Sequence, residues 1–231
     1  MGLTELALLT EMPVPSASRH VRQLVEWGAL ERRDDGKYVI GVRLWEVASL
    51  APRGHGVREI ALPFMEDLHD ITRHHVLLAV RENVQAVLIE RLTAHGATDV
   101  AYRVGGRLPL RSTAVGLVLL AGAELDLQQQ MIEATVDHEP GATVMGGAEL
   151  RIGLAQIRRT GVGIVRRTLP SRTISIASPI RGSGGSVRAA LSVVVPDGEV
   201  DPATMVNAVA ATALHISRAL GLDRGAPRAD R

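Results

Sequence analysis

Between Ser16 and Gly28 the apolar positions recur at the spacing of one face of an α-helix. We expect Ser16 to cap this helix, just behind Pro15, and Gly28 to end it. The positions expected to face a core are Ala17, Val21, Leu24 and Gly28. The remaining face is polar and basic. Since Arg and Gln bond base edges in the major groove and Ser bonds phosphate, this face predicts contact with DNA.

After Gly28 the alternation of apolar and polar residues changes to that of a β-hairpin. Leu30 and Arg32 precede the turn sequence 34–36, and Tyr38 and Ile40 follow it. The order of helix and hairpin favours the interpretation that they are a recognition helix followed by a wing. An ordinary amphipathic helix and hairpin at the edge of a larger domain is the alternative. The side chains assigned to DNA are Ser16, Ser18, Arg19, His20, Arg22, Gln23, Arg33 and Lys37.

A boundary is predicted near residue 51, where helical spacing over 42–50 is interrupted by Pro52, Gly54 and Gly56. Helical spacing resumes at Val57, and Pro63 predicts a kink or a helix start nearby. The apolar face of this helix is expected to carry Ile60, Ala61, Phe64, Leu68 and Ile71.

The rest of the chain alternates strand-like and helical patterns, which predicts an α+β domain whose mostly antiparallel sheet is flanked by helices. Strands are expected at 76–80, 84–92, 100–104, 162–168, 174–180 and 187–195, and helices at 114–122, 124–134, 149–160 and 201–220. Residues 105–113 and 141–147 are predicted loops, and 223–231 is a predicted disordered tail.

Composition narrows the classes of protein that these elements can form. Of the 231 residues, 46% are hydrophobic but only 2% are aromatic, so Ala, Val, Leu and Ile must supply the core. The formal net charge of +1 means that any DNA-binding surface is local. The absence of cysteine excludes disulfides, and no apolar run is long enough to span a bilayer. These features favour a cytoplasmic protein with no membrane partner.

Several motifs together resemble the IclR family of bacterial transcription regulators, over 3–222. They are Ser16-x-x-Arg19, Gly36-Lys37-Tyr38-x-x-Gly41, the segment 62–68, Val104-Gly105-x-x-Leu108-Pro109-Leu110-x-x-Thr113-Ala114-x-Gly116, Ala177-x-Pro179 and 190–193. The resemblance implies a winged helix-turn-helix at 1–41, a linker helix and hinge at 42–56, and a GAF-like effector-binding domain at 57–222. It also implies a dimer or tetramer on a palindromic operator, and a small organic acid or aromatic catabolite as effector.

The same resemblance implies which residues contact the effector: Leu110, Thr113, Ala114, Val115, Gly116, Ser175 and Ser192. Three departures from the family pattern are visible. The chain begins where the family's second helix begins, so the first helix of the three-helix unit is expected to be missing. Leu117 replaces a usual Lys and Val194 a usual Ser, which favours an effector with an apolar or aromatic body.

Other candidate chemistry is sparse. The loop that leads into the helix at 114–122 is a candidate anion site, because free amides at a helix start attract a carboxylate; a tight turn that packs Pro109 against the sheet is the alternative. Arg107 and Arg111 flank this loop and could hold a carboxylate, although exposed arginines usually do not. Residues 171–173 could face the same cavity as the loop 105–113, although a solvent-exposed loop is the favoured interpretation. The histidines lack a metal-ligand spacing, and no nucleophile motif, phosphate loop or cofactor motif is present, so no metal, cofactor or enzyme activity is expected. A small-molecule sensor that does not bind DNA is the alternative function.

Overall fold

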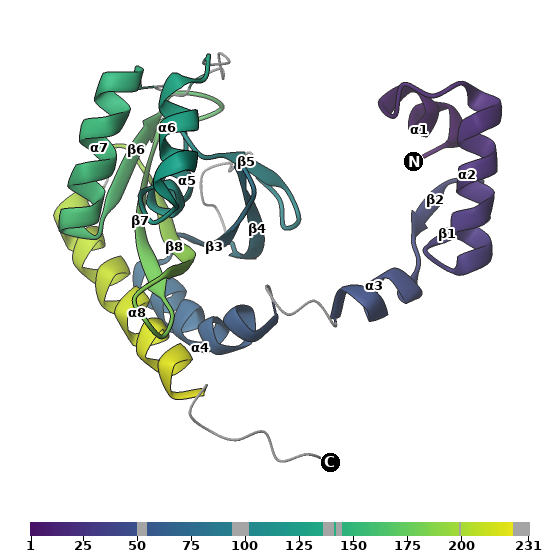
Figure 1. Cartoon of the computed structure of the whole chain (residues 1–231). Helices are drawn as coiled ribbons and strands as arrows, with labels where there is room; N and C mark the ends of the chain where they lie inside the picture. The colour runs from purple at the N-terminus through teal and green to yellow at the C-terminus, as the bar shows by residue number, and fades with distance from the viewer. Residues whose placement is uncertain (50–54, 94–101, 136–140, 142–144, 199, 224–231) are drawn as a thin grey trace. The chain divides into compact units, whose positions relative to one another are not determined.

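The computed structural model describes residues 1–49, 55–93, 102–135, 141, 145–198 and 200–223. The chain divides into two compact units, Met1–His55 and Gly56–Arg231, which we call the N-terminal and C-terminal units (Figure 1). The predicted hinge residues 50–54 and most of the predicted tail, 224–231, lie outside the described residues. No helix among the described residues is long and apolar enough to cross a membrane.

The N-terminal unit places two helices before a two-stranded hairpin and one helix after it. Its elements are α1 Leu3–Leu9, α2 Val14–Trp27, β1 Leu30–Arg32, β2 Tyr38–Ile40 and α3 Val42–Ser49. The predicted capping role of Ser16 is wrong, because α2 already begins at Val14. Pro15 has no N–H to satisfy and suits the first turn of a helix, so the helix extends past it toward the N-terminus. Gly28 ends α2 in the left-handed conformation, at φ 83°.

The buried core of the N-terminal unit is small. Ala17 and Val21 are buried as predicted, but Leu24 is 43% exposed, so its predicted place in the core is wrong. The hairpin packs closely against the end of α2: a Cβ added to Gly41 would lie 2.3 Å from the carbonyl oxygen of Gly28. Glycine at position 41 therefore permits this approach of two backbone segments.

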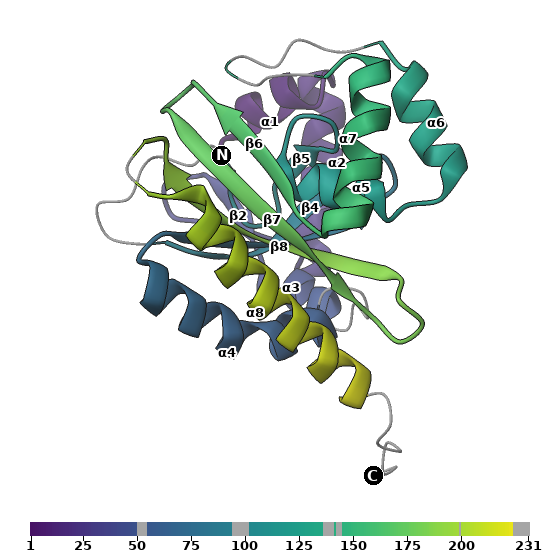
Figure 2. The same ribbon diagram turned by 90° about the vertical axis from the view of Figure 1, so that its left-hand side faces the viewer.

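The C-terminal unit is built on one antiparallel sheet with strand order β5-β4-β3-β8-β7-β6 (Figure 2). This confirms the predicted α+β fold with helices on both faces. The strands are β3 His75–Glu82, β4 Gln85–Leu92, β5 Arg107–Pro109, β6 Gly163–Arg167, β7 Thr173–Arg181 and β8 Val187–Pro196. The helices are α4 His55–Thr72, α5 Ala114–Ala121, α6 Leu125–Glu133, α7 Gly147–Thr160 and α8 Pro202–Asp223.

Two apolar cores lie on the two faces of this sheet. On one face, α4 and α8 lie side by side and bury residues such as Met65 and Val209 against the strands (Figure 2). On the other face, α5 and α7 pack over Leu88 and Ala190. Helix α5 is buried along its whole length, so it serves as the central helix of this layer.

Two predictions in this unit are wrong. Tyr102–Val104 is not a strand, and 100–101 lies outside the described residues; the strand beside β4 is instead Arg107–Pro109, in the predicted loop. Pro63 lies inside α4, which begins well before it, so of the two expected effects a helix start at this proline is excluded. Ile71 is 79% exposed, because the buried stripe of α4 follows Val57, Ala61, Met65 and Leu68.

Candidate DNA-binding and effector-binding sites

The polar face of α2 is open to solvent. Arg19, His20 and Gln23 are exposed, Ser16 is half-buried, and the four positions follow one another at i, i+3, i+4 and i+7 along a single stripe. This stripe lies opposite the buried Ala17 and Val21. The helix therefore presents a continuous row of hydrogen-bonding side chains away from its core. Of the two remaining predicted residues on α2, Arg22 is exposed and Ser18 half-buried.

The hairpin β1–β2, which follows α2 in the sequence, supplies further basic side chains. Its strands pair antiparallel, with Leu30 opposite Ile40, and the Arg33 N–H donates to the Lys37 carbonyl at 2.8 Å to close the turn. The Lys37 ammonium lies 3.4 Å from the Asp35 carboxylate, and both side chains are more than half exposed. Because water screens such a pair, Lys37 stays available to a phosphate.

An apolar pocket with a polar end is present in the C-terminal unit, between the start of α5 and the strands β6, β7 and β8. Its apolar walls are Leu77, Leu108, Ala114, Val115, Val165, Leu169, Pro170 and Val194. Its polar lining is Tyr102, Ser112, Thr113, Arg167, Thr173, Ser175 and Ser192. The pocket thus includes Thr113, Ala114, Val115, Ser175 and Ser192 from the predicted set, and Thr173 from the segment considered for the same cavity.

Leu110 and Gly116, also predicted to contact the effector, do not line the pocket. Leu110 is buried in the core beneath α5. A Cβ on Gly116 would lie 2.5 Å from the Pro109 carbonyl oxygen, so this glycine lets the loop approach the helix start. Both residues support the pocket wall from behind.

Thr113 fixes the start of α5 at the edge of the pocket. Its Oγ1 accepts a hydrogen bond from the Gly116 N–H at 3.1 Å and donates to the Pro109 carbonyl at 2.8 Å. This is an N-cap, in which a side-chain oxygen satisfies a helix N–H that has no partner within the helix. The cap holds Ala114 and Val115 in the pocket wall.

Among the described residues that line the pocket, Arg167 of β6 is the charged one. Its Nη1 donates to the Tyr102 hydroxyl at 2.8 Å, and its guanidinium carbon lies 5.5 Å from the centre of the Tyr102 ring. A guanidinium in a largely apolar cavity is suited to a carboxylate, which it can bind through two parallel hydrogen bonds. Neither Arg167 nor Tyr102 was predicted from the sequence as an effector-binding residue. Alternation along β6 was the available signal for Arg167, because it lies two positions after the apolar Val165 and shares its face.

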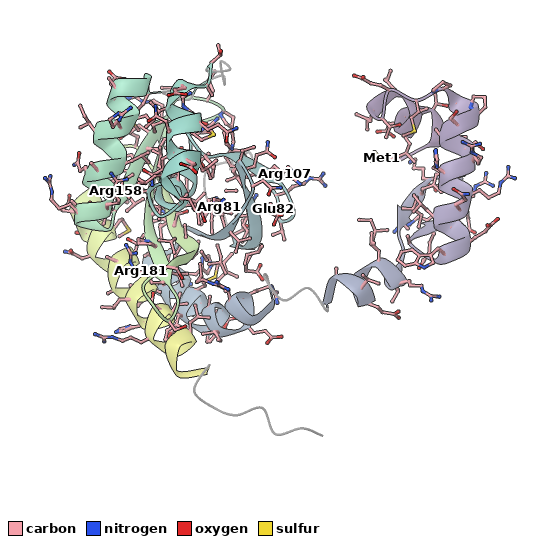
Figure 3. All side chains as sticks on the ribbon, viewed as in Figure 1. Met1, Arg81, Glu82, Arg107, Arg158 and Arg181 are labelled. Atoms are coloured by element: carbon pink, nitrogen blue, oxygen red, sulfur yellow. The ribbon has the colours of Figure 1, made fainter. Side chains whose placement is uncertain are left out.

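The two arginines of the predicted loop 105–113 lie outside the pocket. Arg107 is exposed on β5 and donates to Gln85 at 3.1 Å (Figure 3). Arg111 is buried and donates to the carbonyls of Ala134 and Met145, at 2.8 and 2.9 Å. Neither lines the pocket, which agrees with the expectation that these arginines do not hold a carboxylate there: Arg111 joins loop segments, and Arg107 stabilises the sheet edge.

No group of three His, Cys, Asp or Glu residues in the described part of the chain is placed to hold a metal ion. A unit that exposes a polar and basic helix followed by a hairpin, joined to a unit with a largely apolar pocket, is the arrangement of a DNA-binding transcription regulator with a ligand-binding domain.

The chain belongs to the IclR family of bacterial transcriptional regulators. The family model "Bacterial transcriptional regulator IclR C-terminal" matches residues 51–218, and the model "IclR helix-turn-helix domain" matches residues 1–34. The chain is therefore a DNA-binding regulator of transcription and not an enzyme.

Similar proteins include two curated regulators from Escherichia coli strain K12. The HTH-type transcriptional regulator XynR is 29% identical over 228 residues, which cover 96% of this chain and 90% of XynR. The HTH-type transcriptional repressor AllR is 27% identical over 226 residues, covering 96% of this chain and 83% of AllR. A solved structure of an IclR homolog from Microbacterium hydrocarbonoxydans, complexed with 4-hydroxybenzoate, is 33% identical with a TM-score of 0.87, and covers 98% of this chain and 92% of that one.

Proposed function

We propose that this protein is a ligand-responsive regulator that binds a palindromic operator as a dimer or tetramer, and whose DNA affinity changes when an aromatic carboxylate enters the C-terminal pocket. The observation that carries the effector class is the pairing of apolar walls with the Arg167 guanidinium in one cavity. A ring would contact Leu108, Val165 and Val194, and its carboxylate would accept from Arg167.

The remaining polar groups of the pocket suit a second polar substituent on the ring. Ser175 and Ser192 come from neighbouring strands, and their hydroxyls can donate or accept. The homolog complexed with 4-hydroxybenzoate, an acid of this class, supports the choice. 4-Hydroxybenzoate is therefore the first probe, rather than the assigned effector.

The DNA side of the proposal rests on α2 and the hairpin. The stripe containing Arg19 and Gln23 would enter the major groove, and Arg33 and Lys37 would contact the backbone nearby. In a dimer, the two recognition helices would match half-sites about one helical turn or a multiple apart, which gives a palindromic operator. Since AllR is a repressor, we propose repression as the output, in the cytoplasm where the operator lies.

The test of DNA binding is fluorescence anisotropy with duplex DNA from upstream of the protein's own gene and with a scrambled duplex, at two salt concentrations. We expect tighter binding to the upstream DNA, weakening as salt rises, because phosphate contacts release counterions. Equal affinity for the two duplexes would contradict the operator assignment.

The test of effector class is calorimetry with 4-hydroxybenzoate and with 4-hydroxybenzamide, which keeps the shape but lacks the negative charge. We expect the acid to bind more tightly, and Arg167→Ala to weaken its binding at least tenfold, because a charge-assisted pair is lost. Arg107→Ala is the matched control, since Arg107 is an exposed arginine outside the pocket. Equal affinity for the acid and the amide would show that Arg167 does not bind the carboxylate.

A further inference from the structure

A series of hydrogen bonds runs from the pocket to the first turns of α4. The Arg167 guanidinium donates to the Tyr102 hydroxyl at 2.8 Å, and Arg91 Nη1 donates to the Tyr102 carbonyl at 2.7 Å. The backbone N–H of Arg91 donates to Glu90 Oε1 at 2.9 Å, and Glu90 Oε2 lies 2.5 Å from Arg58 Nη2. We call these five residues the relay. Each link is short enough to be a direct hydrogen bond or ion pair.

A β-bulge in β4 turns Glu90 to the face of the sheet opposite to that of Leu88. Leu78 pairs with Glu90 while the next residue of β3 pairs with Leu88, so Ile89 is the extra residue of β4. Beyond the bulge, Arg91 lies opposite Leu77, a pocket residue, and Glu90 lies opposite Leu78, in the core beneath α4 and α8. A bulge re-aims the side chains that follow it. Here Glu90 lies on the face covered by α4 and α8, and Arg91, the next residue, lies on the face of the pocket.

The far end of the relay lies where the chain enters the C-terminal unit. Arg58 is in the first turns of α4, and α4 begins at His55, the last residue of the N-terminal unit. The Glu90 side chain is only 13% exposed and that of Arg58 42% exposed. Partial burial makes this pair less screened than a surface pair, so its geometry matters to the position of α4.

We propose that the relay transmits occupancy of the pocket to the start of α4, with Glu90 as the residue that couples the two. This inference rests on the proposed function, because it concerns how the same effector site is read. A carboxylate in the pocket competes with the neutral Tyr102 hydroxyl for the Arg167 guanidinium, and the charged acceptor binds more strongly. Tyr102 then moves. Because its carbonyl accepts a hydrogen bond from Arg91, this movement displaces Arg91 and, through it, alters the Glu90–Arg58 ion pair.

The size of the pocket supports a change of this kind. Its volume is about 40 Å³, whereas a benzene ring is known to fill an engineered apolar cavity of about 150 Å³. An aromatic acid therefore requires side chains in the wall to move. Tyr102 is in the wall and at the start of the relay, so entry of a ring acts on it directly.

The first experiment needs neither effector nor operator. A double-mutant cycle combines Tyr102→Phe, which removes only the hydroxyl, with Glu90→Gln, which removes the charge opposite Arg58. Urea unfolding of the full chain gives the free energies. Residues that do not communicate add to within about twofold in the unfolding equilibrium constant, so we expect non-additivity of at least about threefold.

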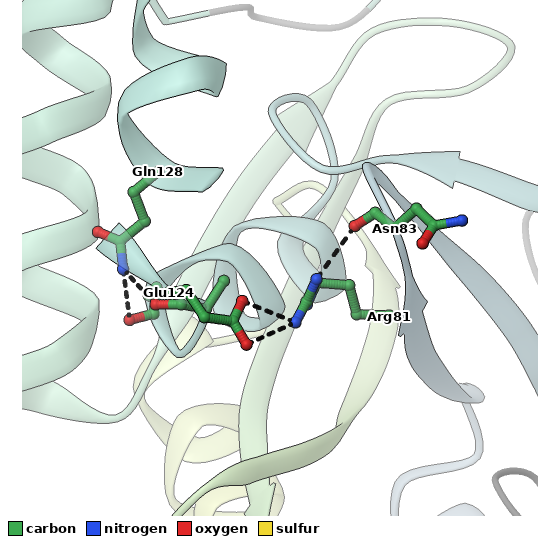
Figure 4. A network of polar contacts seen from close by, with 6 residues as sticks. Arg81, Asn83, Glu124 and Gln128 are labelled. Carbon is green, nitrogen blue, oxygen red and sulfur yellow. Dashed lines mark hydrogen bonds and ion pairs between the residues drawn. The ribbon is translucent and has the colours of Figure 1, made fainter. Parts of the chain in front are cut away.

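The matched control is Glu124→Gln. Glu124 also pairs with an arginine, Arg81, at 3.0 and 3.3 Å, but this network leads to Asn83 rather than to the pocket (Figure 4). The cycle of Tyr102→Phe with Glu124→Gln should be additive. Hydrogen exchange should also be faster over residues 56–62 in Tyr102→Phe, and unchanged there in Glu124→Gln. Additivity in both cycles, with unchanged exchange over 56–62, would overturn the relay.

A second experiment separates the relay from the proposed function. The affinity for upstream DNA is measured with and without saturating 4-hydroxybenzoate in the parent, Glu90→Gln and Glu124→Gln. We expect a change of at least fivefold in the parent and in Glu124→Gln, and less than twofold in Glu90→Gln, with the acid at a concentration that saturates each protein. An undiminished response in Glu90→Gln overturns the relay while the proposed function stands. No response in the parent counts against this effector class, while the double-mutant cycle still decides the relay.

Discussion

Removal of the Thr113 hydroxyl should destabilise the C-terminal unit by an amount that the structure allows us to work out. Thr113→Val keeps the shape of the side chain but loses both hydrogen bonds of Oγ1, in a position that is only 6% exposed. Loss of the cap at Gly116 costs about 1 kcal/mol, and the unsatisfied Pro109 carbonyl adds about 1 kcal/mol more. The total is about 2 kcal/mol, which is a large share of the stability of an ordinary domain.

The assay is urea unfolding of the full chain followed by far-UV circular dichroism, which is dominated by the larger C-terminal unit. With an m-value of about 2 kcal/mol/M, a loss of 2 kcal/mol lowers the midpoint by about 1 M. Both tryptophans, Trp27 and Trp45, lie in the N-terminal unit, so the fluorescence transition should be unchanged. Thr113→Ser keeps the hydroxyl and is the control. A midpoint for Thr113→Val within 0.2 M of the control, or about one fifth of the expected shift, would refute the capping argument.

Three further predictions concern other parts of the molecule. Arg19→Ala should weaken binding to the upstream duplex about tenfold or more while leaving the dichroism spectrum intact, and equal affinity of mutant and parent would remove Arg19 from the DNA face. Gly41→Ala should lower the free energy of unfolding from the fluorescence transition by about 1–3 kcal/mol, because its Cβ meets the rigid Gly28 carbonyl; an unchanged free energy would mean that the hairpin can move away. Met65→Ala, at a fully buried position of α4, should cost about 2–5 kcal/mol by urea unfolding, and a loss below 1 kcal/mol would show that the core closes over the cavity.

The long elements of the fold were predictable from periodicity because burial on one face imposes it. Strands β7 and β8 and helices α7 and α8 were predicted to within three residues. β5 was not, since three residues that follow two glycines and end in a proline carry no period, and only pairing with β4 makes them a strand. Ile71 shows the same limit: it lies at helical spacing next to the end of α4 at Thr72, yet it is 79% exposed.

The candidate pocket was only partly predictable. Residues around Thr113 could be assigned because the family motif is local in sequence, and five of the seven predicted positions line the cavity. Arg167 and Tyr102 come from separate segments that only the folded sheet brings together. Proximity in sequence to the predicted loop brought only Arg107 and Arg111 into consideration, and their side chains bond to Gln85 and Ala134 outside the pocket.

The two ends of the six-stranded sheet have a consequence for how the protein behaves when it is concentrated. Its edge strands are the shortest of the sheet: β5 has three residues and ends at Pro109, and β6 has five and carries the exposed Arg166. Proline cannot donate to an incoming strand, and arginines from two copies repel one another. These edges therefore resist the strand-to-strand growth that leads to aggregates, so that assembly of copies is left to surfaces other than the sheet.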